Sequence, residues 1–337
     1  MKRNTYRWLF ILLAIAVTVV YWIFFMSNTH ESHNVTVKIP TGSKYEDVLE
    51  LLRQNHVLEN EISFTIVSKL KHYPQRVKPG NYLFYKGMNN RQMINMLEFG
   101  LQTPVTLVIY NIRTKEEFAG LVGRTLELDS NAVLAKLNED SFCKQYGLDT
   151  STILTHFLVD NYEFYWTVSM DKFLERMNKS YNSFWNKDRL AKADAIHLSP
   201  TKVTILASIV EKEVMHDVEM ARVAGVYMNR LRLGMPLQAD PTLVFALHDF
   251  DAKRVNSYHK EYDSRYNTYK YAGLPPGPVC MPYHKSIDAV LNAEKNDFLY
   301  FCADPSLNGY SIFSKTLKEQ MDVAAQYRKK LDMMGVH

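Results

Sequence analysis

The chain has 337 residues, a length that predicts about two domains. Hydrophobic residues make up 47% and charged residues 23%, which is enough apolar material for a sizeable core and excludes wholesale disorder. The 40 basic and 36 acidic side chains leave a net charge of only +4, which does not favour nucleic acid as a partner. Three cysteines are too few for a disulfide-built scaffold.

The segment at residues 8–26, WLFILLAIAVTVVYWIFFM, contains no charged residue. A helix here would be roughly 28 Å long at about 1.5 Å per residue, close to the thickness of a bilayer core. Basic residues precede it, and the nearest acid after it is Glu31, so the positive-inside rule predicts a cytoplasmic tail at residues 1–7. We expect a single-pass anchor in the cytoplasmic (inner) membrane with the body of the chain outside. The alternative is a signal peptide, but the apolar run is long and no small-x-small cleavage site follows it.

After a polar linker at residues 27–34, a pattern of strand, turn and amphipathic helix occurs three times. Alternating apolar residues predict the strands, and apolar residues three and four apart predict the helices that follow. The predicted strands cover residues 35–40, 80–87 and 105–111. We expect a small α+β module over residues 35–128, which either binds glycan or a partner or acts as a spacer above the membrane.

Residues 129–199 are predicted to be mainly helical and to connect this module to the C-terminal part. Within them, FLVDNYEFYW at 157–166 sets Asp160 and Asn161 among aromatic rings. Such clusters more often form core than site, although polar groups among rings also suit a sugar.

The C-terminal region, residues 200–337, begins with a clear helix start. Ser199 is a favourable N-cap, and Pro200 suits the first helical position. A second helix is predicted over about 217–233. Two strand-like segments separated by Pro and Asn-Gly predict a hairpin, and a long surface helix follows it. The predicted strands of this hairpin are 298–304 and 310–314, and the last helix is about 316–333.

The helix that begins at Pro200 carries a carboxylate on its apolar face. On a helical wheel Glu213 lies within about 20° of Leu206, in the middle of the apolar stripe, whereas Glu211 lies on the flank. A charged carboxylate in apolar surroundings is costly, so its pKa rises toward the range that a general acid needs at neutral pH. We therefore predict that Glu213 is catalytic and that Glu211 is solvated or ion-paired.

Structural explanations for Glu213 also exist, namely an ion pair with Arg222 or Arg230, or emergence at the helix end. Asp240, in PLQADPT, is the best candidate for a second acid, although Asp-Pro-Thr is also ordinary helix-cap sequence. Hydrolysing glycosidases generally need two carboxylates, so the residues alone leave the number of catalytic acids open.

Hydrogen-bonding side chains interleaved with aromatic rings follow this helix, a mixture that suits a neutral or weakly acidic sugar chain. Each of them also has an ordinary explanation as a loop hydrogen-bonder. The predicted substrate-binding residues are Asn229, Arg230, Gln238, Asp240, Thr242, Tyr266 and Asn267.

Cysteine and histidine spacings do not match a zinc site, so neither a metal nor a cofactor is implied. Outside the cytoplasm Cys280 and Cys302 could form a disulfide. Burial of all three cysteines, including Cys143, as small apolar side chains is at least as good an interpretation.

Four motifs in the C-terminal region, in this order and spacing, resemble the endolytic murein transglycosylases, the YceG-like or MltG family. They are ILASIVEKE at 205–213, VYMNRLRLGMPLQADPT at 226–242, YNTY at 266–269 and GLPPGP at 273–278. The resemblance implies a lyase that cuts the β-1,4 bond between N-acetylmuramic acid and N-acetylglucosamine within peptidoglycan strands and leaves 1,6-anhydro ends. The catalytic glutamate of the family is the second Glu of the EKE triplet, here Glu213, which the helical wheel selects independently. One carboxylate then suffices, because the C6 hydroxyl of the sugar attacks and Glu213 can donate and later accept a proton.

The resemblance covers nearly the whole chain. It implies that the module at 35–128 is LysM-like, that residues 200–337 form a mixed α+β catalytic domain, and that the enzyme limits the length of nascent strands. Peptidoglycan is the implied substrate, with cell-wall synthases and division proteins as partners. A non-catalytic peptidoglycan-binding scaffold and a hydrolytic muramidase remain alternative functions. Several positions depart from the family pattern, among them Val214, Cys280, Tyr310 and Gln320.

Overall fold

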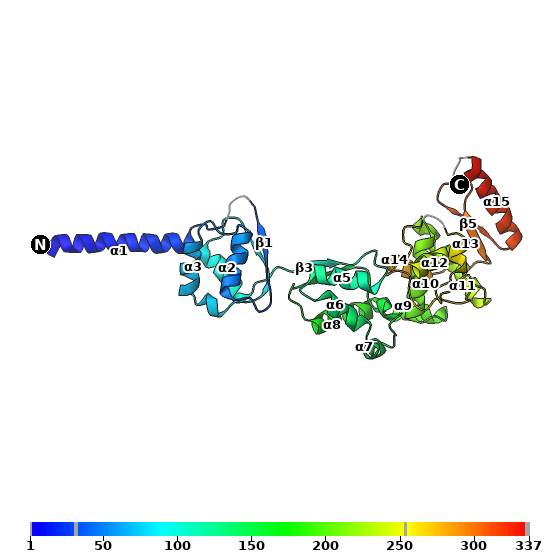
Figure 1. The fold of residues 1–337 in the computed structure, drawn as a ribbon, viewed down its shortest axis with the longest axis horizontal. Coiled ribbons are helices and arrows are strands. Elements are labelled where there is room, and N and C mark those ends of the chain that lie inside the picture. The colour runs from blue at the N-terminus through cyan, green and yellow to red at the C-terminus, as the bar shows by residue number, and fades with distance from the viewer. Residues whose placement is uncertain (1, 30–32, 253–254, 334–337) are drawn as a thin grey trace. The chain divides into compact units, whose positions relative to one another are not determined.

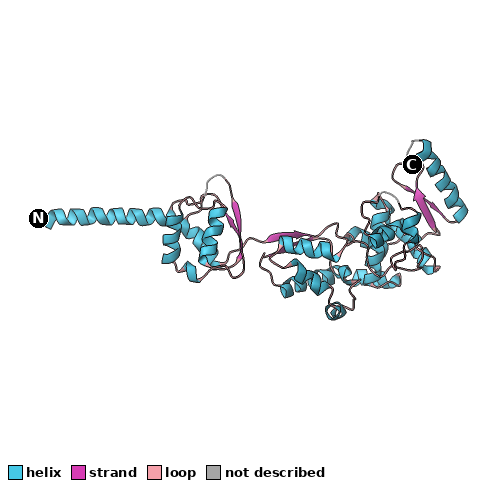
Figure 2. Cartoon of the chain, in the orientation of Figure 1, coloured by secondary structure: helices cyan, strands magenta, loops and turns pink. Residues whose placement is uncertain are grey.

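The computed structural model describes residues 2–29, 33–252 and 255–333. The fold is mixed α+β, with many helices and short strands (Figure 1, Figure 2). The chain divides into two compact units. Unit 1 comprises residues 1–107, 123–128 and 163–169, and unit 2 comprises 108–122, 129–162 and 170–337.

Unit 1 begins with a long apolar helix. Residues Tyr6–Phe25 have a mean hydropathy of 2.5, and none of this span is buried in the protein. Among the described residues it is the one helix long and apolar enough to cross a membrane, a property that a signal sequence shares. The elements from here to the first boundary are α1 (Lys2–Phe25), β1 (Val35–Ile39), α2 (Tyr45–Gln54), α3 (Glu61–Leu70), η1 (Tyr73–Gln75), β2 (Gly80–Phe84), α4 (Asn90–Phe99) and β3 (Val105–Val108).

Strands β1 and β2 pair antiparallel, with Val35 opposite Phe84 and Ile39 opposite Gly80. Their inward side chains pack with helices α2, α3 and α4 into one apolar core. The predicted strands of this region are therefore confirmed, whereas helix α3 was not predicted, because its sequence EISFTIVSKL is rich in β-branched residues that favour strands.

Asn28 and Thr29, which fall in the predicted linker at 27–34, are buried in unit 1. Asn28 donates through Nδ2 to Oδ1 of Asn90 at 2.6 Å and accepts from the backbone N–H of Asn60 at 2.6 Å. These bonds tie the end of α1 to α3 and α4. Residues 30–32 lie outside the described residues.

The next segment is mainly helical, as predicted, with one short strand within the aromatic run. The rings of that run are mostly buried, whereas Asp160 and Asn161 are exposed. The elements are α5 (Lys115–Thr125), α6 (Ser130–Leu137), α7 (Asp140–Gln145), η2 (Ile153–His156), β4 (Asn161–Phe164), α8 (Met170–Phe184) and α9 (Lys187–Ala195).

The rest of unit 2 contains all four sequence motifs. Its elements are α10 (Pro200–Glu213), η3 (Asp217–Glu219), α11 (Met220–Arg232), α12 (Asp240–Leu247), α13 (Ser257–Glu261), α14 (His284–Leu291), β5 (Tyr300–Ala303), β6 (Ser311–Ser314) and α15 (Leu317–Met333).

Helix α10 lies in the core of unit 2 and contacts α9, α11, α12 and α14. Ser199 caps it as predicted, because its hydroxyl accepts from the N–H of Lys202. Residues 203–210 are buried on every side, including Thr204 and Ser208, whose hydroxyls donate to carbonyls of their own helix. The helix therefore reaches the surface only in its first and last turns.

The predicted C-terminal hairpin is confirmed. Strands β5 and β6 pair antiparallel, with Tyr300 opposite Ser314, and α15 contacts both of them. All three cysteines are free thiols; Cys143 and Cys280 are buried and Cys302 is partly buried. The Cys280–Cys302 disulfide is therefore not formed.

Candidate active site

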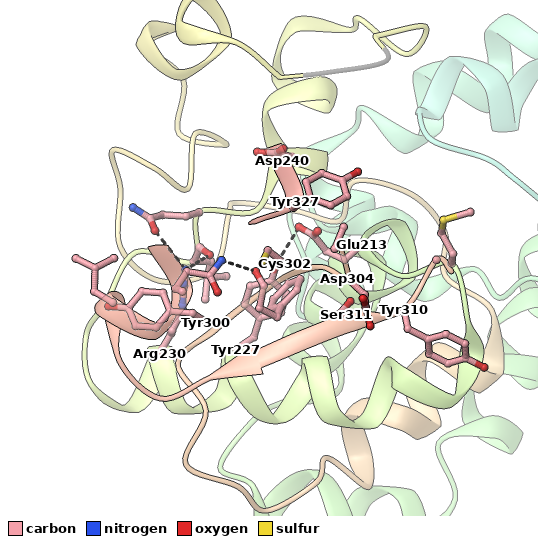
Figure 3. Close-up of a pocket in the computed structure, with 18 of the residues that line it drawn as sticks. Glu213, Tyr227, Arg230, Asp240, Tyr300, Cys302, Asp304, Tyr310, Ser311 and Tyr327 are labelled. Atoms are coloured by element: carbon pink, nitrogen blue, oxygen red, sulfur yellow. Dashed lines mark hydrogen bonds between the residues drawn. The ribbon is translucent and has the colours of Figure 1, made fainter. Parts of the chain in front are cut away.

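Glu213 is the last residue of α10 and lies, partly buried, in the wall of a cavity of about 590 Å³. Its Oε1 accepts a hydrogen bond of 2.8 Å from the hydroxyl of Tyr227 (Figure 3). Burial raises the pKa of Glu213 to about 7; the Tyr227 hydrogen bond lowers the pKa and the negative charge of Asp240 raises it. At neutral pH the carboxyl can therefore donate a proton and later take one back.

Tyr227 comes from α11 and is fully buried beneath the cavity, where its ring packs edge-on against Phe301 with 5.8 Å between centroids. Burial raises the pKa of this phenol well above its ordinary value, and the neighbouring Glu213 raises it further. The hydroxyl therefore stays protonated and is a fixed donor toward the carboxyl.

Asp240 is the first residue of α12 and lines the same cavity as Glu213. Its Oδ1 accepts a 2.5 Å hydrogen bond from the hydroxyl of Tyr269, which comes from the YNTY motif. Residues of two motifs, 29 positions apart, thus meet at one carboxylate. Three acids line the cavity, namely partly buried Glu213 and Asp304 and exposed Asp240.

Arg230 joins the loop after α11 to the C-terminal hairpin. Its side chain is buried; Nε donates to the carbonyl of Leu299 at 2.6 Å and Nη1 to that of Leu237 at 2.6 Å. Its guanidinium lies over the ring of Tyr300 at 5.2 Å. The neighbouring Gln238 has φ +53°, which is uncommon for a residue with a side chain, and its exposed amide lines the cavity.

Two other predicted residues hold loops beneath the cavity instead of lining it. Asn229 donates through Nδ2 to the carbonyls of Asn296 at 2.9 Å and Phe298 at 3.0 Å. Thr242 is fully buried, and its hydroxyl bonds to the carbonyl of Ala239 at 2.7 Å. Both therefore position the segments that carry the cavity residues.

The remaining two, from the YNTY motif, also lie outside this cavity. Asn267 is fully buried and donates through Nδ2 to the carbonyl of Tyr262 at 2.7 Å. Its Oδ1 accepts from the N–H of Tyr269 and so orients the tyrosine that bonds Asp240. Tyr266 packs against Phe245 and lines a separate cavity of about 200 Å³.

Of the two predictions for Glu211, solvation is wrong, because only 7% of its side chain is exposed, and the ion pair is confirmed as a long one, with Nζ of Lys212 3.8 Å from its Oε1. Its Oε2 accepts hydrogen bonds from the N–H of Tyr283 at 2.7 Å and from the hydroxyl of Ser286 at 2.8 Å. Glu211 thus provides an acceptor for donors at the N-terminal end of α14. The ion-pair explanation for Glu213 is not realised: Arg222 pairs with Glu294, and Arg230 bonds carbonyls.

The hairpin and α15 supply cavity residues that sequence reasoning missed. Figure 3 shows how Tyr300, Asp304, Tyr310, Ser311 and Tyr327 lie in the same cavity wall. One indirect sign in the sequence indicated that these segments reach the site. Tyr310 and Gln320, which both line the cavity, are among the positions that depart from the family pattern.

A second cavity, of about 370 Å³, shares Glu213 and Asp240 with the first. Its other walls come largely from α12 and the loop after it, together with Arg113 and Lys212. Glu213 therefore has open space on two sides, which is the arrangement that a chain-like ligand needs if it is to be bound across the carboxyl.

A YceG-like family model matches residues 37–326 of this chain. A Bacillus subtilis (strain 168) protein named endolytic murein transglycosylase is 29% identical over 316 residues, covering 87% of this chain and 84% of that protein. A protein of the same name from Streptococcus pneumoniae (strain D39) is 28% identical and covers 88% of this chain, which spans 59% of that protein's length. A crystal structure of a YceG-like protein from Listeria monocytogenes is similar with a TM-score of 0.59 and 30% identity, covering 86% of this chain and 99% of that one. The extent of the family match shows that this chain belongs to the YceG-like family.

Proposed function

We propose that this chain is an endolytic peptidoglycan lytic transglycosylase in which Glu213 is both general acid and general base. One observation carries the proposal: a carboxyl with a pKa near 7 lies between two open cavities. Relatives named endolytic murein transglycosylase supply the substrate class. The substrate is then a glycan strand that extends through both cavities and is cut in its interior.

In the first step protonated Glu213 gives its proton to the bridging oxygen between N-acetylmuramic acid and N-acetylglucosamine. The glycosidic C–O bond breaks, the N-acetylglucosamine leaves with a 4-hydroxyl, and positive charge develops at the anomeric carbon. The Tyr227 hydroxyl stabilises the carboxylate that Glu213 has become. The exposed carboxylate of Asp240 lines the same cavity, and its negative charge stabilises the positive charge that develops at the anomeric carbon.

In the second step the Glu213 carboxylate accepts the proton of the C6 hydroxyl while O6 attacks the anomeric carbon. A 1,6-anhydro ring forms, Glu213 returns to its starting state, and no water is consumed. This cycle needs only one titrating carboxyl, and a pKa near 7 suits both of its proton transfers.

Binding of the strand is assigned first to the residues that line the cavity, Arg230, Gln238 and Asp240. For Asn229, Thr242 and Asn267 we propose a supporting role, because each fixes a loop that carries one of the lining groups. Tyr266 would contact the strand only where it passes the smaller cavity beside Phe245.

The placement in the cell is also a proposal. Residues 1–7 would lie in the cytoplasm, 8–26 would anchor the chain in the inner membrane, and a LysM-like module at 35–128 would hold the strand. The segment 129–199 would then connect it to a catalytic domain at 200–337. An anchored enzyme of this kind would cut strands soon after synthesis and so limit their length, beside the cell-wall synthases and division proteins.

The neighbourhood of Asp240 favours a second candidate, a hydrolytic muramidase. Both carboxyls line one cavity, so Asp240 could activate a water as the second acid of a hydrolase. The two reactions differ in their products, since hydrolysis leaves a reducing end.

The test is incubation of the full chain in detergent with purified uncrosslinked glycan strands, followed by measurement of strand length. The wild type should shorten the strands internally and Glu213→Gln should not, while exposed Glu175→Gln on α8 should cut like the wild type. Strand binding without cutting by any of the three would favour a non-catalytic scaffold instead.

A further inference from the structure

The second cavity contains a basic pocket that the mechanism above does not use. Two cations, Arg113 and Lys212, line it together with several apolar side chains. The apolar part is Val244, Phe245, Phe250, Val255 and Val279. Because Glu213 and Asp240 also line this cavity, whatever binds here lies within reach of the scissile bond.

Arg113 is held in place by an aromatic ring, with its guanidinium 4.4 Å from the ring centroid of Phe250. Its backbone N–H bonds Glu117, but among the residues that the structure describes no carboxylate lies within ion-pair distance of the guanidinium. An arginine stacked by its face keeps the N–H groups of its edge available, which is the geometry for a carboxylate ligand.

Lys212 is only loosely compensated. Its Nζ lies 3.8 Å from Oε1 of Glu211 and 3.5 Å from Oδ1 of Asn111, both long for a charge-assisted bond. Glu211 meanwhile accepts two shorter bonds at the start of α14. Neither cation is tightly paired, and both lie in the same cavity as Glu213 and Asp240, whose negative charge would otherwise repel an anion.

A ligand for this pocket needs a carboxylate and small apolar groups. The sugar backbone of a peptide-bearing strand offers N-acetyl methyl groups but no free carboxylate, whereas the stem peptide attached to each N-acetylmuramic acid carries both alanine methyl groups and free carboxylates. We propose, on the basis of the proposed function, that this pocket binds the stem peptide of a muramic acid residue next to the scissile bond. The enzyme then distinguishes peptide-bearing strands by their carboxylates.

The test compares rates of cutting on two matched substrates: peptide-bearing strands, and the same strands with peptide carboxylates blocked as methyl amides. Arg113→Met keeps an apolar stem over Phe250 but removes the charge. We expect kcat/KM on peptide-bearing strands to fall about tenfold, the effect of one charge-assisted hydrogen bond, and to stay within about twofold on blocked strands. Lys212→Met should act in the same direction, and Arg113→Lys should recover part of the loss.

Arg265→Met is the matched control, because that guanidinium also lies over a ring, that of Tyr271 at 5.3 Å, yet lines neither cavity. It should cut both substrates like the wild type. An equal loss on both substrates for Arg113→Met, or no loss, would overturn the assignment. A third substrate, strands stripped of peptide by an amidase, retains only the lactoyl carboxylate, and a loss confined to it would also contradict a peptide site.

A binding arm separates this proposal from the proposed function. If the wild type cuts no strand, the function fails, but Glu213→Gln can still be titrated with peptide-bearing and blocked strands. Tighter binding of the peptide-bearing strands, lost on adding Arg113→Met, would support the pocket on its own. Equal binding of the two substrates would refute it.

Discussion

The hydroxyl of Tyr227 on α11 donates a 2.8 Å hydrogen bond to Oε1 of Glu213, the last residue of α10. The phenol is fully buried and its pKa is raised well above the ordinary value, so it donates at every pH at which the protein works. Burial raises the pKa of Glu213 and this hydrogen bond lowers it, and the resulting pKa is about 7. Tyr227 is thus a positioning residue that sets both the direction and the acidity of Glu213.

Tyr227→Phe removes the bond without opening a cavity. The carboxylate form of Glu213 loses its donor, so the pKa of Glu213 should rise by up to about one unit, the equivalent of a hydrogen bond to a charged group. We expect kcat to fall about tenfold or more and the pH profile to move to higher pH. A fall in kcat with an unmoved profile would show that Tyr227 acts only through packing.

The pH dependence of the wild type follows from the pKa of Glu213, about 7. The acid step needs the protonated form, which predominates below that pKa and is lost above it. We predict that kcat/KM declines above about pH 7, tenfold per unit, as measured on uncrosslinked strands from pH 5 to 9. A rate that stays constant through pH 8.5 would contradict Glu213 as the acid.

Arg230→Lys should cost stability. The buried guanidinium donates hydrogen bonds to the carbonyl of Leu237, in the loop after α11, and to that of Leu299, just before β5. The single ammonium group of a lysine cannot reproduce both hydrogen bonds. We expect unfolding to be easier by about 2–4 kcal/mol, measured by denaturant titration.

The control for this change is Arg222→Lys on the same helix, where the arginine is half exposed and pairs with Glu294. That change should cost less than about 1 kcal/mol. Equal effects at the two positions would mean that Arg230 does not hold the two segments together.

His156 predicts an acid sensitivity elsewhere in unit 2. Its ring lies between Tyr146 and Tyr181, with centroids 4.1 and 4.2 Å away, and burial lowers its pKa to about 4. In the unfolded chain the pKa is about 6.5, so protons bind the unfolded state first as the pH falls. The stability contributed by neutral His156 is therefore fully present above about pH 6.5. The free energy of unfolding should decrease by up to about 3 kcal/mol as the pH falls to 4.

His156→Phe keeps the ring between the two tyrosines and removes the titration. Its free energy of unfolding should change less between pH 6.5 and pH 4 than that of the wild type. Parallel stability curves for the two proteins would exclude His156 as the source of the acid sensitivity.

Local pattern was sufficient for much of the fold. Alternation located β1 and β2, the turn residues between two strand-like segments located the hairpin, and Ser199 with Pro200 located the start of α10. Helix α3 was missed because its β-branched residues favour a strand locally. The burial of Asn28 was not predicted because its partner Asn90 lies 62 positions away in the chain.

The candidate site shows the same limit. The wheel selected Glu213 from an apolar stripe, yet residues 203–210 of α10 are buried on every side, so a one-sided stripe does not describe this part of the helix. The burial of Glu211 at the start of α14 was not predicted, because its hydrogen-bond partner Tyr283 lies 72 positions away. The wall formed by the hairpin and α15 likewise depends on contacts between distant segments.

The central claim is that Glu213 cleaves strands without water. Mass spectrometry of the products formed in H₂¹⁸O tests it most directly, with wild type beside Glu213→Gln. We predict new muramic ends from the wild type alone, free of ¹⁸O and about 20 Da lighter than hydrolysis products, because the C6 hydroxyl replaces water. Reducing ends that contain ¹⁸O would contradict the account and identify a hydrolase with Asp240 as its second acid; new ends from Glu213→Gln would contradict the assignment of the acid itself.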